Sequence, residues 1–284
     1  MILDRLYTPS DDELIYHYCP AQAFIDIMTS KTVWLSAFYA LNDTMERSWG
    51  YSIFDKAIQE LKKDADPKFI DRTVRLVSEA YFYSLVMVGS FSLDGDVISQ
   101  WRAYADDGRG FAIGFSPKLL QAPAKKLRVL YDEERQLQEL LGNLKHVHEY
   151  EKSIGYKYNE EFEGHLFGIA GDLIAYKHPS FREEQEIRLA HLAGVHPEGR
   201  IIPLGAIGPD GKRLSDPLKT RFRQRNGVLV PYVVMDYTNN GELAPVKEVV
   251  LGPCNEDPEW SIKLFLNTLG MKDATVRRST IPYR

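Results

Sequence analysis

The stretch that most constrains this fold covers residues 177–189 and reads KHPSFREEQEIRL. Pro179 pushes the residue before it out of helical space, so the stretch should open as a turn. After the turn, Glu184, Glu186 and Arg188 alternate with Gln185, Ile187 and Leu189, which is the two-residue period of a strand. Three charged groups on one strand face are costly to bury unless they pair or take part in chemistry. A solvent-facing strand would show the same pattern, so the rest of the chain has to decide between the two.

The bulk composition describes a large globular chain with an acidic balance. Its 284 residues are 44% hydrophobic and 26% charged, enough for a substantial core. The net charge of -5 argues against broad nucleic-acid binding by counterion release, although a local basic patch stays compatible with it. Cys19 and Cys254 are far apart and suit unpaired thiols in a reducing compartment. Without a leader or an apolar run of membrane length, the sequence predicts a cytoplasmic protein with no membrane contact.

Hydrophobic periodicity predicts an α+β chain with mostly short strands. Strands are expected at residues 14–18, 32–36, 81–93, 111–115, 127–131, 228–237, 246–251 and 275–278, and around Glu186. Two helical inserts are expected at about 48–80, broken near Asp66-Pro67, and at 132–176. The sequence shows no repeat and no linker, so we expect a single domain over 1–284.

Well-known catalytic signatures are missing from the sequence. There is no Rossmann glycine fingerprint, P-loop, nucleophile elbow, kinase motif set or zinc-protease pair. The pair His146 and His148 lacks a third ligand, and a solvated helix face explains it better than zinc. Arg221, Arg223 and Arg225 alternate as on one strand face, where they could meet an anion or simply water. Function therefore has to come from residues dispersed along the chain.

Polar and aromatic residues gather at the predicted strand ends and loops, where sites usually form. The candidates are His17, Tyr18, Ser36, Asn42, Asp43, Glu46, Trp101, Arg102, Tyr104, Glu186 and Arg188. Each has an ordinary structural interpretation: His17 as a core histidine, Asn42-Asp43 as a turn, Trp101 as a core plug, and Glu186 with Arg188 as a surface ion pair of little worth. Their grouping is what favours a site.

Several short motifs resemble the bacterial domain-of-unknown-function family numbered 2971, over nearly the whole chain. They are IYHY at 15–18, WLS at 34–36, LND with Glu46 at 41–46, SFS at 90–92, QW with Tyr104 at 100–104, GFAIGF at 110–115, KHPSFREEQEIR at 177–188, EVVLGP at 248–253 and IPYR at 281–284. That family carries no assigned activity, so this resemblance implies no chemistry.

A second resemblance does imply chemistry. A His-bearing first strand, a short helix, a second strand ending in Ser and a late Glu-x-Glu strand are similar to the ADP-ribosyltransferase superfamily. The resemblance implies a split-sheet fold with NAD as substrate and no metal. Glu186 would be the catalytic carboxylate, His17 would hold the nicotinamide-side ribose or amide, and Ser36 would lie beside it. Trp101 or Tyr104 would stack near nicotinamide, with Tyr18, Asn42 and Arg102 completing the cofactor site.

The chemistry of NAD cleavage fits these residue types. Breaking the nicotinamide–ribose bond passes through an oxocarbenium-like transition state, which needs an ionised carboxylate nearby. Arg188 on the same strand face would keep Glu186 ionised and would join the catalytic set. Two features depart from the superfamily pattern: the long helical insert near 48–80 and Arg188 itself.

The sequence therefore predicts an NAD-dependent protein that modifies a macromolecule, either a nucleic acid or a protein, in phage defence or as a toxin. A regulatory or antitoxin partner would accompany that role. Two alternatives stay open at this point. One is a non-catalytic module that senses or binds a nucleotide, and the other is a metal-dependent hydrolase or nuclease built on Asn42, Asp43, Glu46 and Glu186.

Overall fold

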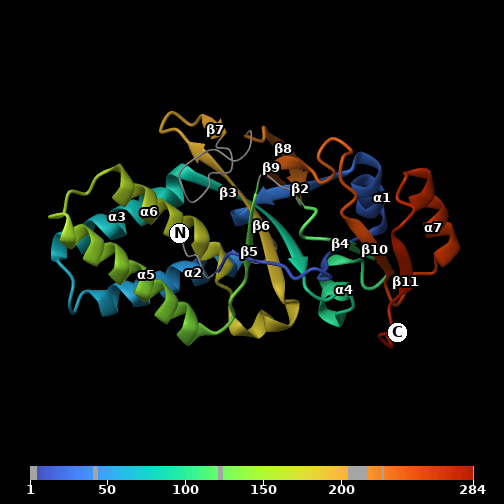
Figure 1. Ribbon diagram of the computed structural model, residues 1–284, viewed down its shortest axis with the longest axis horizontal. Coiled ribbons are helices and arrows are strands. Elements are labelled where there is room, and N and C mark those ends of the chain that lie inside the picture. The colour runs from blue at the N-terminus through green and yellow to red at the C-terminus, as the bar shows by residue number, and fades with distance from the viewer. Residues whose placement is uncertain (1–4, 41–43, 121–123, 204–216, 226, 284) are drawn as a thin grey trace.

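The computed structural model describes residues 5–40, 44–120, 124–203, 217–225 and 227–283. Figure 1 shows an elongated molecule with a helical lobe at one end and a sheet in the middle. The helical lobe consists of α2 (Thr44–Leu61), α3 (Pro67–Tyr83), α5 (Glu133–Ser153) and α6 (Glu160–Asp172). At the opposite end, α1 (Ala21–Ser30) and α7 (Glu259–Thr268) lie against the sheet (Figure 1).

The sheet is mixed, and most of its strands are short. Its strands are β1 (Ile15–Cys19), β2 (Thr32–Ala37), β3 (Ser84–Ser92), β4 (Phe111–Phe115), β5 (Lys125–Arg128), β6 (Glu186–Val195), β7 (Ile201–Pro203), β8 (Thr220–Arg225), β9 (Val228–Asp236), β10 (Val246–Leu251) and β11 (Thr275–Arg278). Strands β10 and β11 pair in parallel, and the other pairs are antiparallel. An α+β chain with a mixed sheet is therefore confirmed at that level.

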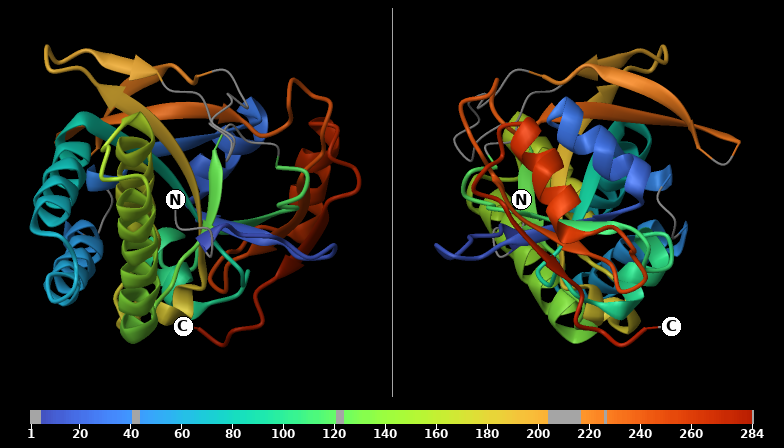
Figure 2. Two further views of the ribbon diagram at one scale, coloured as in Figure 1. Left: turned by 60° about the vertical axis from the view of Figure 1, so that its left-hand side comes forward. Right: turned by 90° about the vertical axis from the view of Figure 1, so that its right-hand side faces the viewer.

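Strand β3 organises the centre of the sheet. It pairs with β6 along its whole length, from Ser84 to Ser92. Strand β1 reaches β3 at Ser92, and β2 reaches it at Met87 and Val88. Because β6 occupies one edge of β3, strands β1 and β2 must share the other edge, each near one end. From there β1 continues into β4, β10 and β11, while β2 continues into β9 and β8. The right-hand view in Figure 2 shows the β8–β9 hairpin standing out from the body.

Two apolar cores flank this arrangement. One lies on the sheet face covered by α1 and α7 and includes Met87, Phe91, Ile187 and Leu189. The other fills the helical lobe. A smaller cluster joins the lobe to the opposite sheet face, and its members are Phe38, Val88, Leu127, Ile174 and Ala175. Strand β6 is therefore buried on both faces rather than exposed to solvent on one.

Local sequence signals explain where the lobe helices begin. Asp66 accepts hydrogen bonds from the backbone N–H groups of Lys68 and Phe69, and Pro67 occupies the first helical position. Asp132 and Asn159 cap α5 and α6 in the same way. The helices thus lie close to the predicted inserts, with the predicted break at Asp66-Pro67.

Several predicted strand boundaries were wrong. The strand expected at 127–131 spans Lys125–Arg128. The strand expected from residue 81 begins only at Ser84, because α3 continues through the aromatic run at 81–83, and helix packing there overrides β propensity. Glu184 was expected on the strand of Glu186, but it ends the 3₁₀ turn η4 (Pro179–Glu184). Gln185 then adopts a left-handed conformation with φ 43°, so the extended strand starts at Glu186.

Candidate functional site

The pairing register decides which side chains share a face of the sheet. Directly paired residues point to the same face, and alternate residues of one strand do the same. Glu186 pairs with Ser92, which in turn pairs with Tyr16, while Arg188 pairs with Ser90 and Ser36 pairs with Val88. Glu186, Arg188, Ser36, Tyr16 and Tyr18 therefore lie on one face, which we call the Glu186 face.

Glu186 and Arg188 form a buried ion pair on this face. Arg188 donates from Nε to Oε1 of Glu186 at 2.9 Å and from Nη2 to Oε2 at 2.7 Å. The exposed fractions are 5% for Glu186 and 0% for Arg188. Such a two-bond contact fixes both groups in orientation as well as in charge. The pair is therefore buried, and the alternative interpretation as a surface ion pair was wrong.

A second cation and a second carboxylate extend the pair into a cluster. Lys177 is also buried, and its Nζ donates to Oε2 of Glu186 at 3.4 Å and, more closely, to Glu184. The other guanidinium nitrogen of Arg188 donates to the backbone carbonyl of Ile174, and the guanidinium lies 5.1 Å from the ring centre of Phe38. We call Lys177, Glu184, Glu186 and Arg188 the ion cluster. Two cations and two carboxylates balance in charge, as burial requires.

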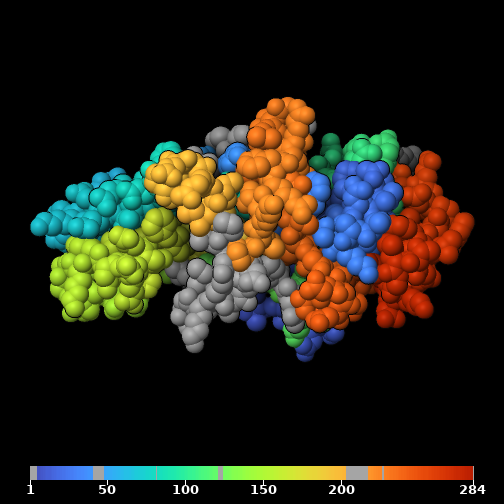
Figure 3. Space-filling model, turned by 90° about the horizontal axis from the view of Figure 1, so that it is seen from above, coloured from blue at the N-terminus to red at the C-terminus, as the bar shows by residue number. Residues whose placement is uncertain are grey.

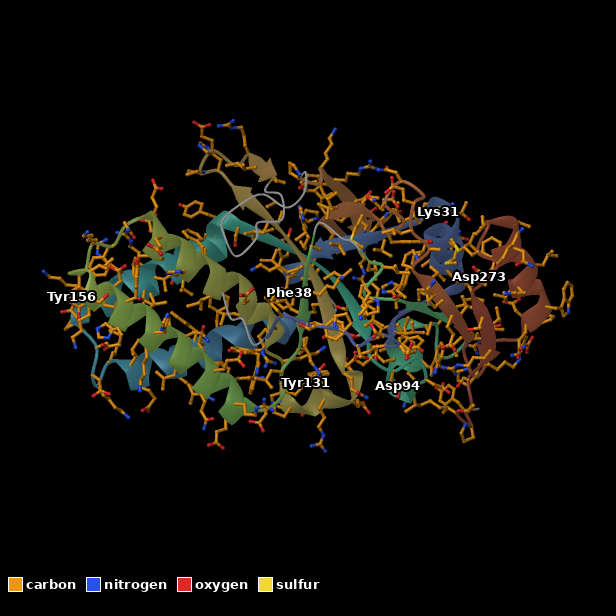
Figure 4. The ribbon with its side chains drawn as sticks, viewed as in Figure 1. Lys31, Phe38, Asp94, Tyr131, Tyr156 and Asp273 are labelled. Atoms are coloured by element: carbon orange, nitrogen blue, oxygen red, sulfur yellow. The ribbon has the colours of Figure 1, made fainter. Side chains whose placement is uncertain are left out.

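The ion cluster keeps the Glu186 carboxylate ionised. Burial alone would raise its pKa, but the charges of Arg188 and Lys177 and the hydrogen bonds from Arg188 and the Ser90 hydroxyl lower the pKa to about 2. The backbone N–H of Glu186 donates to the Tyr131 hydroxyl at 2.9 Å, which anchors the start of β6. Figure 4 labels Tyr131 beside that start, and Phe38 between the lobe and the sheet.

The structure places His17 on the face opposite Glu186. His17 pairs with Ile113 and its ring packs 5.4 Å from that of Phe91, both of which belong to the core under α1 and α7. Its Nδ1 lies 3.0 Å from the carbonyl oxygen of Ser90, and burial lowers the pKa of its imidazole. A neutral ring that donates from Nδ1 fits this contact. His17 reaches Glu186 only through Ser90, whose hydroxyl bonds the carboxylate.

Tyr18 and Trp101 share a small aromatic cluster on the Glu186 face. The ring of Trp101 meets that of Tyr18 edge-on at 4.8 Å and is fully buried in α4 (Ile98–Tyr104). Its Nε1 donates to Asp96 at 2.9 Å, and the Tyr18 hydroxyl donates to the carbonyl of Asp94. Trp101 thus packs as a core plug that supports this face. Tyr104 lies half-buried at the margin of the cluster.

The remaining predicted residues lie further out or beyond the described ranges. Arg102 is exposed on α4. Ser36 is buried on β2 and accepts a hydrogen bond from Nη2 of Arg223 at 2.9 Å. Asn42 and Asp43 lie outside the described residues, and Glu46 is in α2. Within the described part of the chain, no three His, Cys, Asp or Glu side chains come close enough together to hold a metal ion.

A pocket opens on the Glu186 face where the helical lobe meets the sheet. Aromatic and aliphatic residues line it: Phe38, Tyr39, Tyr51, Ser84, Leu85, Val86, Ala170, Leu173 and Ile174. Arg188 contacts both Phe38 and Ile174, so its guanidinium lies directly behind the pocket wall. The pocket therefore has aromatic walls with a buried cation behind one of them, and no local pattern indicates that these segments meet.

Sequence reasoning missed three residues that complete the ion cluster and its supports: Lys177, Glu184 and Ser90. Lys177 and Glu184 stand in the stretch 177–189, and their charges were the available signal. Ser90 lies in the motif SFS at 90–92, where nothing in its type indicated contact with a strand almost a hundred residues later.

The comparisons with known proteins add one finding. Residues 100–189, from α4 to the first part of β6, match a family model described as a protein of unknown function (DUF2971). This segment resembles that family. It holds Trp101, Tyr104, Glu186 and Arg188 but neither His17 nor Ser36, so the DUF2971 match is shorter than the near full-length resemblance expected. No curated protein and no solved structure matches the chain. Among the described helices, none has the length and apolar character to cross a membrane.

Proposed function

We propose that the protein binds NAD at the Glu186 face and transfers ADP-ribose from it to a macromolecule, in the manner of ADP-ribosyltransferases. The observation that carries the proposal is the Glu186 carboxylate, which stays ionised and is linked through Arg188 to the wall of the aromatic pocket. Cleavage of the nicotinamide–ribose bond builds positive charge on the ribose carbon, and a fixed carboxylate stabilises that charge. The reaction needs no group beyond NAD and the acceptor.

The pocket supplies the remaining requirements of the proposed site. Its walls include Phe38, Tyr39 and Tyr51, which are the flat rings against which a nicotinamide or adenine ring packs. Arg188 lies behind the pocket wall and holds the Glu186 carboxylate in a fixed orientation through two hydrogen bonds. Lys177 lies 3.4 Å from Oε2 of Glu186, further than either bonding nitrogen of Arg188, and it is already paired with Glu184. A ligand hydroxyl could therefore replace Lys177 at Oε2 while the Arg188 contact stays intact.

Within this proposal the roles of two predicted residues change. His17 lies on the other face and acts by positioning: it holds the Ser90 backbone, and the Ser90 hydroxyl bonds Glu186. Trp101 stabilises the sheet beneath Tyr18 instead of stacking on the ligand. The His17→Gln variant should therefore transfer ADP-ribose more slowly, while its affinity for NAD should change less.

The test is transfer of label from NAD to a cell extract, together with calorimetric NAD binding. The Glu186→Gln variant should bind NAD and lose transfer by about 10²-fold or more. Tyr39→Ala, at an exposed wall residue, should weaken NAD binding. Glu183→Gln, at an exposed neighbour of the ion cluster, is the matched control and should behave as wild type. Thermal melts separate loss of fold from loss of chemistry. Wild-type protein that neither binds NAD nor transfers label would overturn the proposal.

A non-catalytic nucleotide-binding module is the second candidate, and one observation favours it. The Glu186 carboxylate already accepts from Arg188, Lys177 and Ser90, so its oxygens are occupied without a ligand. In that case NAD or a related nucleotide would bind in the pocket and leave unchanged. Binding by wild type with no turnover, and equal binding by Glu186→Gln, would select this candidate.

A further inference from the structure

The outer strands β2, β9 and β8 carry a second group of residues on the Glu186 face. Trp34 is 47% exposed, and its ring lies 4.5 Å from that of Tyr232 at an interplanar angle of 30°. Tyr232 pairs with both Ser36 on β2 and Arg221 on β8, so the rings and the arginines share one face. Figure 3 shows the β8–β9 hairpin protruding between α1 and the β6–β7 end of the sheet.

Arg223 joins the rings to the arginines. Its guanidinium lies 5.2 Å from the ring centre of Trp34 and 5.7 Å from that of Tyr232. Nη2 donates to Ser36, while the buried Nε has no hydrogen-bond partner among the described residues. Arg225 lies two residues along the same face of β8. Burial and the repulsion from its charge both lower the pKa of Arg223. An anion at this place would offset that repulsion and satisfy Nε.

Arg221, Arg223 and Arg225 lie at alternate positions of β8, so they project from one face at steps of about 7 Å. In the described ranges, no ion pair to a carboxylate involves Arg221 or Arg223. The whole chain carries a net charge of -5, so this row of three arginines is a local exception to its acidic balance. We call Trp34, Tyr232, Arg221, Arg223 and Arg225 the arginine strip.

We propose that the arginine strip binds single-stranded nucleic acid. Aromatic rings beside a row of cations are how proteins hold an unpaired strand of nucleic acid: the bases stack on the rings while the cations follow the phosphates. Here Trp34 offers the exposed ring, and Tyr232, which is only 8% exposed, packs against it. A flat strand face with an exposed Trp fits a splayed base better than the closed stack of a duplex. Arg223 serves both functions, because it lies over the rings and carries an unsatisfied donor. This inference does not depend on the proposed NAD site. If both proposals hold, the bound nucleic-acid strand is the acceptor of ADP-ribose.

The test is fluorescence polarisation with short labelled oligouridylate and oligothymidylate, on the full chain at several salt concentrations. Wild type should bind saturably, with affinity that falls as salt rises. Trp34→Ala should weaken binding by roughly five-fold or more, the loss of about one stacked base. Arg221→Gln and Arg223→Gln should each lower the salt slope by about 1. Trp260→Ala on α7 and Arg135→Gln on α5 change exposed residues of the same types outside the strip and should bind as wild type.

Three outcomes would overturn the proposal. The first is absence of saturable binding at low salt, and the second is a Trp34→Ala variant that binds as wild type. The third is displacement of the oligonucleotide by excess NAD together with loss of NAD binding in Trp34→Ala, because the strip would then belong to a dinucleotide site. Oligonucleotide binding that persists in a protein unable to bind NAD would support the strip while contradicting the proposed transferase.

Discussion

Arg188 donates two hydrogen bonds to the carboxylate of Glu186, which lies two residues earlier on the same strand. Both side chains are buried, so the pair is isolated from the solvent that weakens most ion pairs. Its partners come from three other places: Lys177 (itself paired with Glu184) before the strand, Ser90 on β3, and the Ile174 carbonyl at the edge of the helical lobe. The pair therefore ties the sheet to the lobe at the position where we place the site.

Removal of Arg188 alone should strongly destabilise the protein. In Arg188→Met, Glu186 would keep its charge in a buried position with only Lys177 and Ser90 as partners, and the free energy of unfolding should fall by about 3–5 kcal/mol. Urea unfolding measures this. The double variant Glu186→Leu with Arg188→Met removes both charges and should be less destabilised than the sum of the two single variants. Strict additivity would contradict a coupled pair.

Acid should destabilise the fold through Glu186. The folded pKa of about 2 lies below the ordinary value of 4.5, so the unfolded chain binds the proton first. The stabilisation is therefore complete above about pH 4.5 and is lost as the pH falls toward 2, with a slope of up to about 1.4 kcal/mol per pH unit. Unfolding free energies measured from pH 6 down should show this decline, and Glu186→Gln should flatten it. Glu183→Gln, which changes an exposed carboxylate, should leave the profile as it is.

Part of the Glu186 face could be predicted from the sequence. The two-residue period around Glu186 and Arg188 predicted that the two side chains share a strand face, and they do. The same period implies that His17 and Tyr18 point to opposite faces of the first strand, although both were expected in one site. Which of these two faces also holds Glu186 depends on the pairing of β1, β3 and β6, and pairing register is set by tertiary contacts that no local pattern encodes. That is why His17 and Glu186 were expected together and are found apart.

Burial of strand β6 is the other property that local sequence patterns could not predict. Strand β6 resembles a surface strand in its charges, yet Phe38, Ile174 and the helical lobe cover it. Likewise, the hydrogen bond between Arg223 and Ser36 joins residues 187 positions apart, and no spacing rule indicates it. The helix starts near Asp66-Pro67 and at about residue 132 were predicted from the sequence, because a capping side chain acts on the residues that follow it directly.

The two cysteines should differ sharply in reactivity. Cys19 is buried in β1, and burial raises the pKa of its thiol well above the ordinary value, so almost none is thiolate at neutral pH. Cys254 is only half-buried. Under native conditions a thiol reagent should modify Cys254 quickly and Cys19 only at the rate of unfolding, as read by mass spectrometry over time. Cys254→Ser should abolish the fast phase. A fast phase that remains in that variant would show that β1 opens in the native state.

Asp96 should control how firmly the C-terminal segment holds to the sheet. Its carboxylate accepts from Nε1 of Trp101 at 2.9 Å and from the backbone N–H of Thr280 at 2.8 Å, and the Ser279 hydroxyl also donates to it. Burial would raise its pKa, but these donors outweigh burial and lower it. Asp96→Ala leaves the Trp101 N–H buried without its partner and should cost about 1–3 kcal/mol. It should also speed carboxypeptidase trimming of the C-terminus, because the tail loses its attachment.

Trp101→Phe separates the two effects of Asp96. The ring would still fill its place in the cluster, and Asp96 would still bind Ser279 and Thr280, so stability should fall while trimming stays slow. Asp71→Ala, at an exposed carboxylate on α3, should change neither reading. Equal trimming rates in wild type and Asp96→Ala would mean that other contacts hold the tail, foremost the hydrogen bond from the Tyr283 hydroxyl to Asp107. The Asp96 contacts join α4, which carries Trp101, to the end of the chain, so their loss should loosen the aromatic cluster beneath Tyr18 as well.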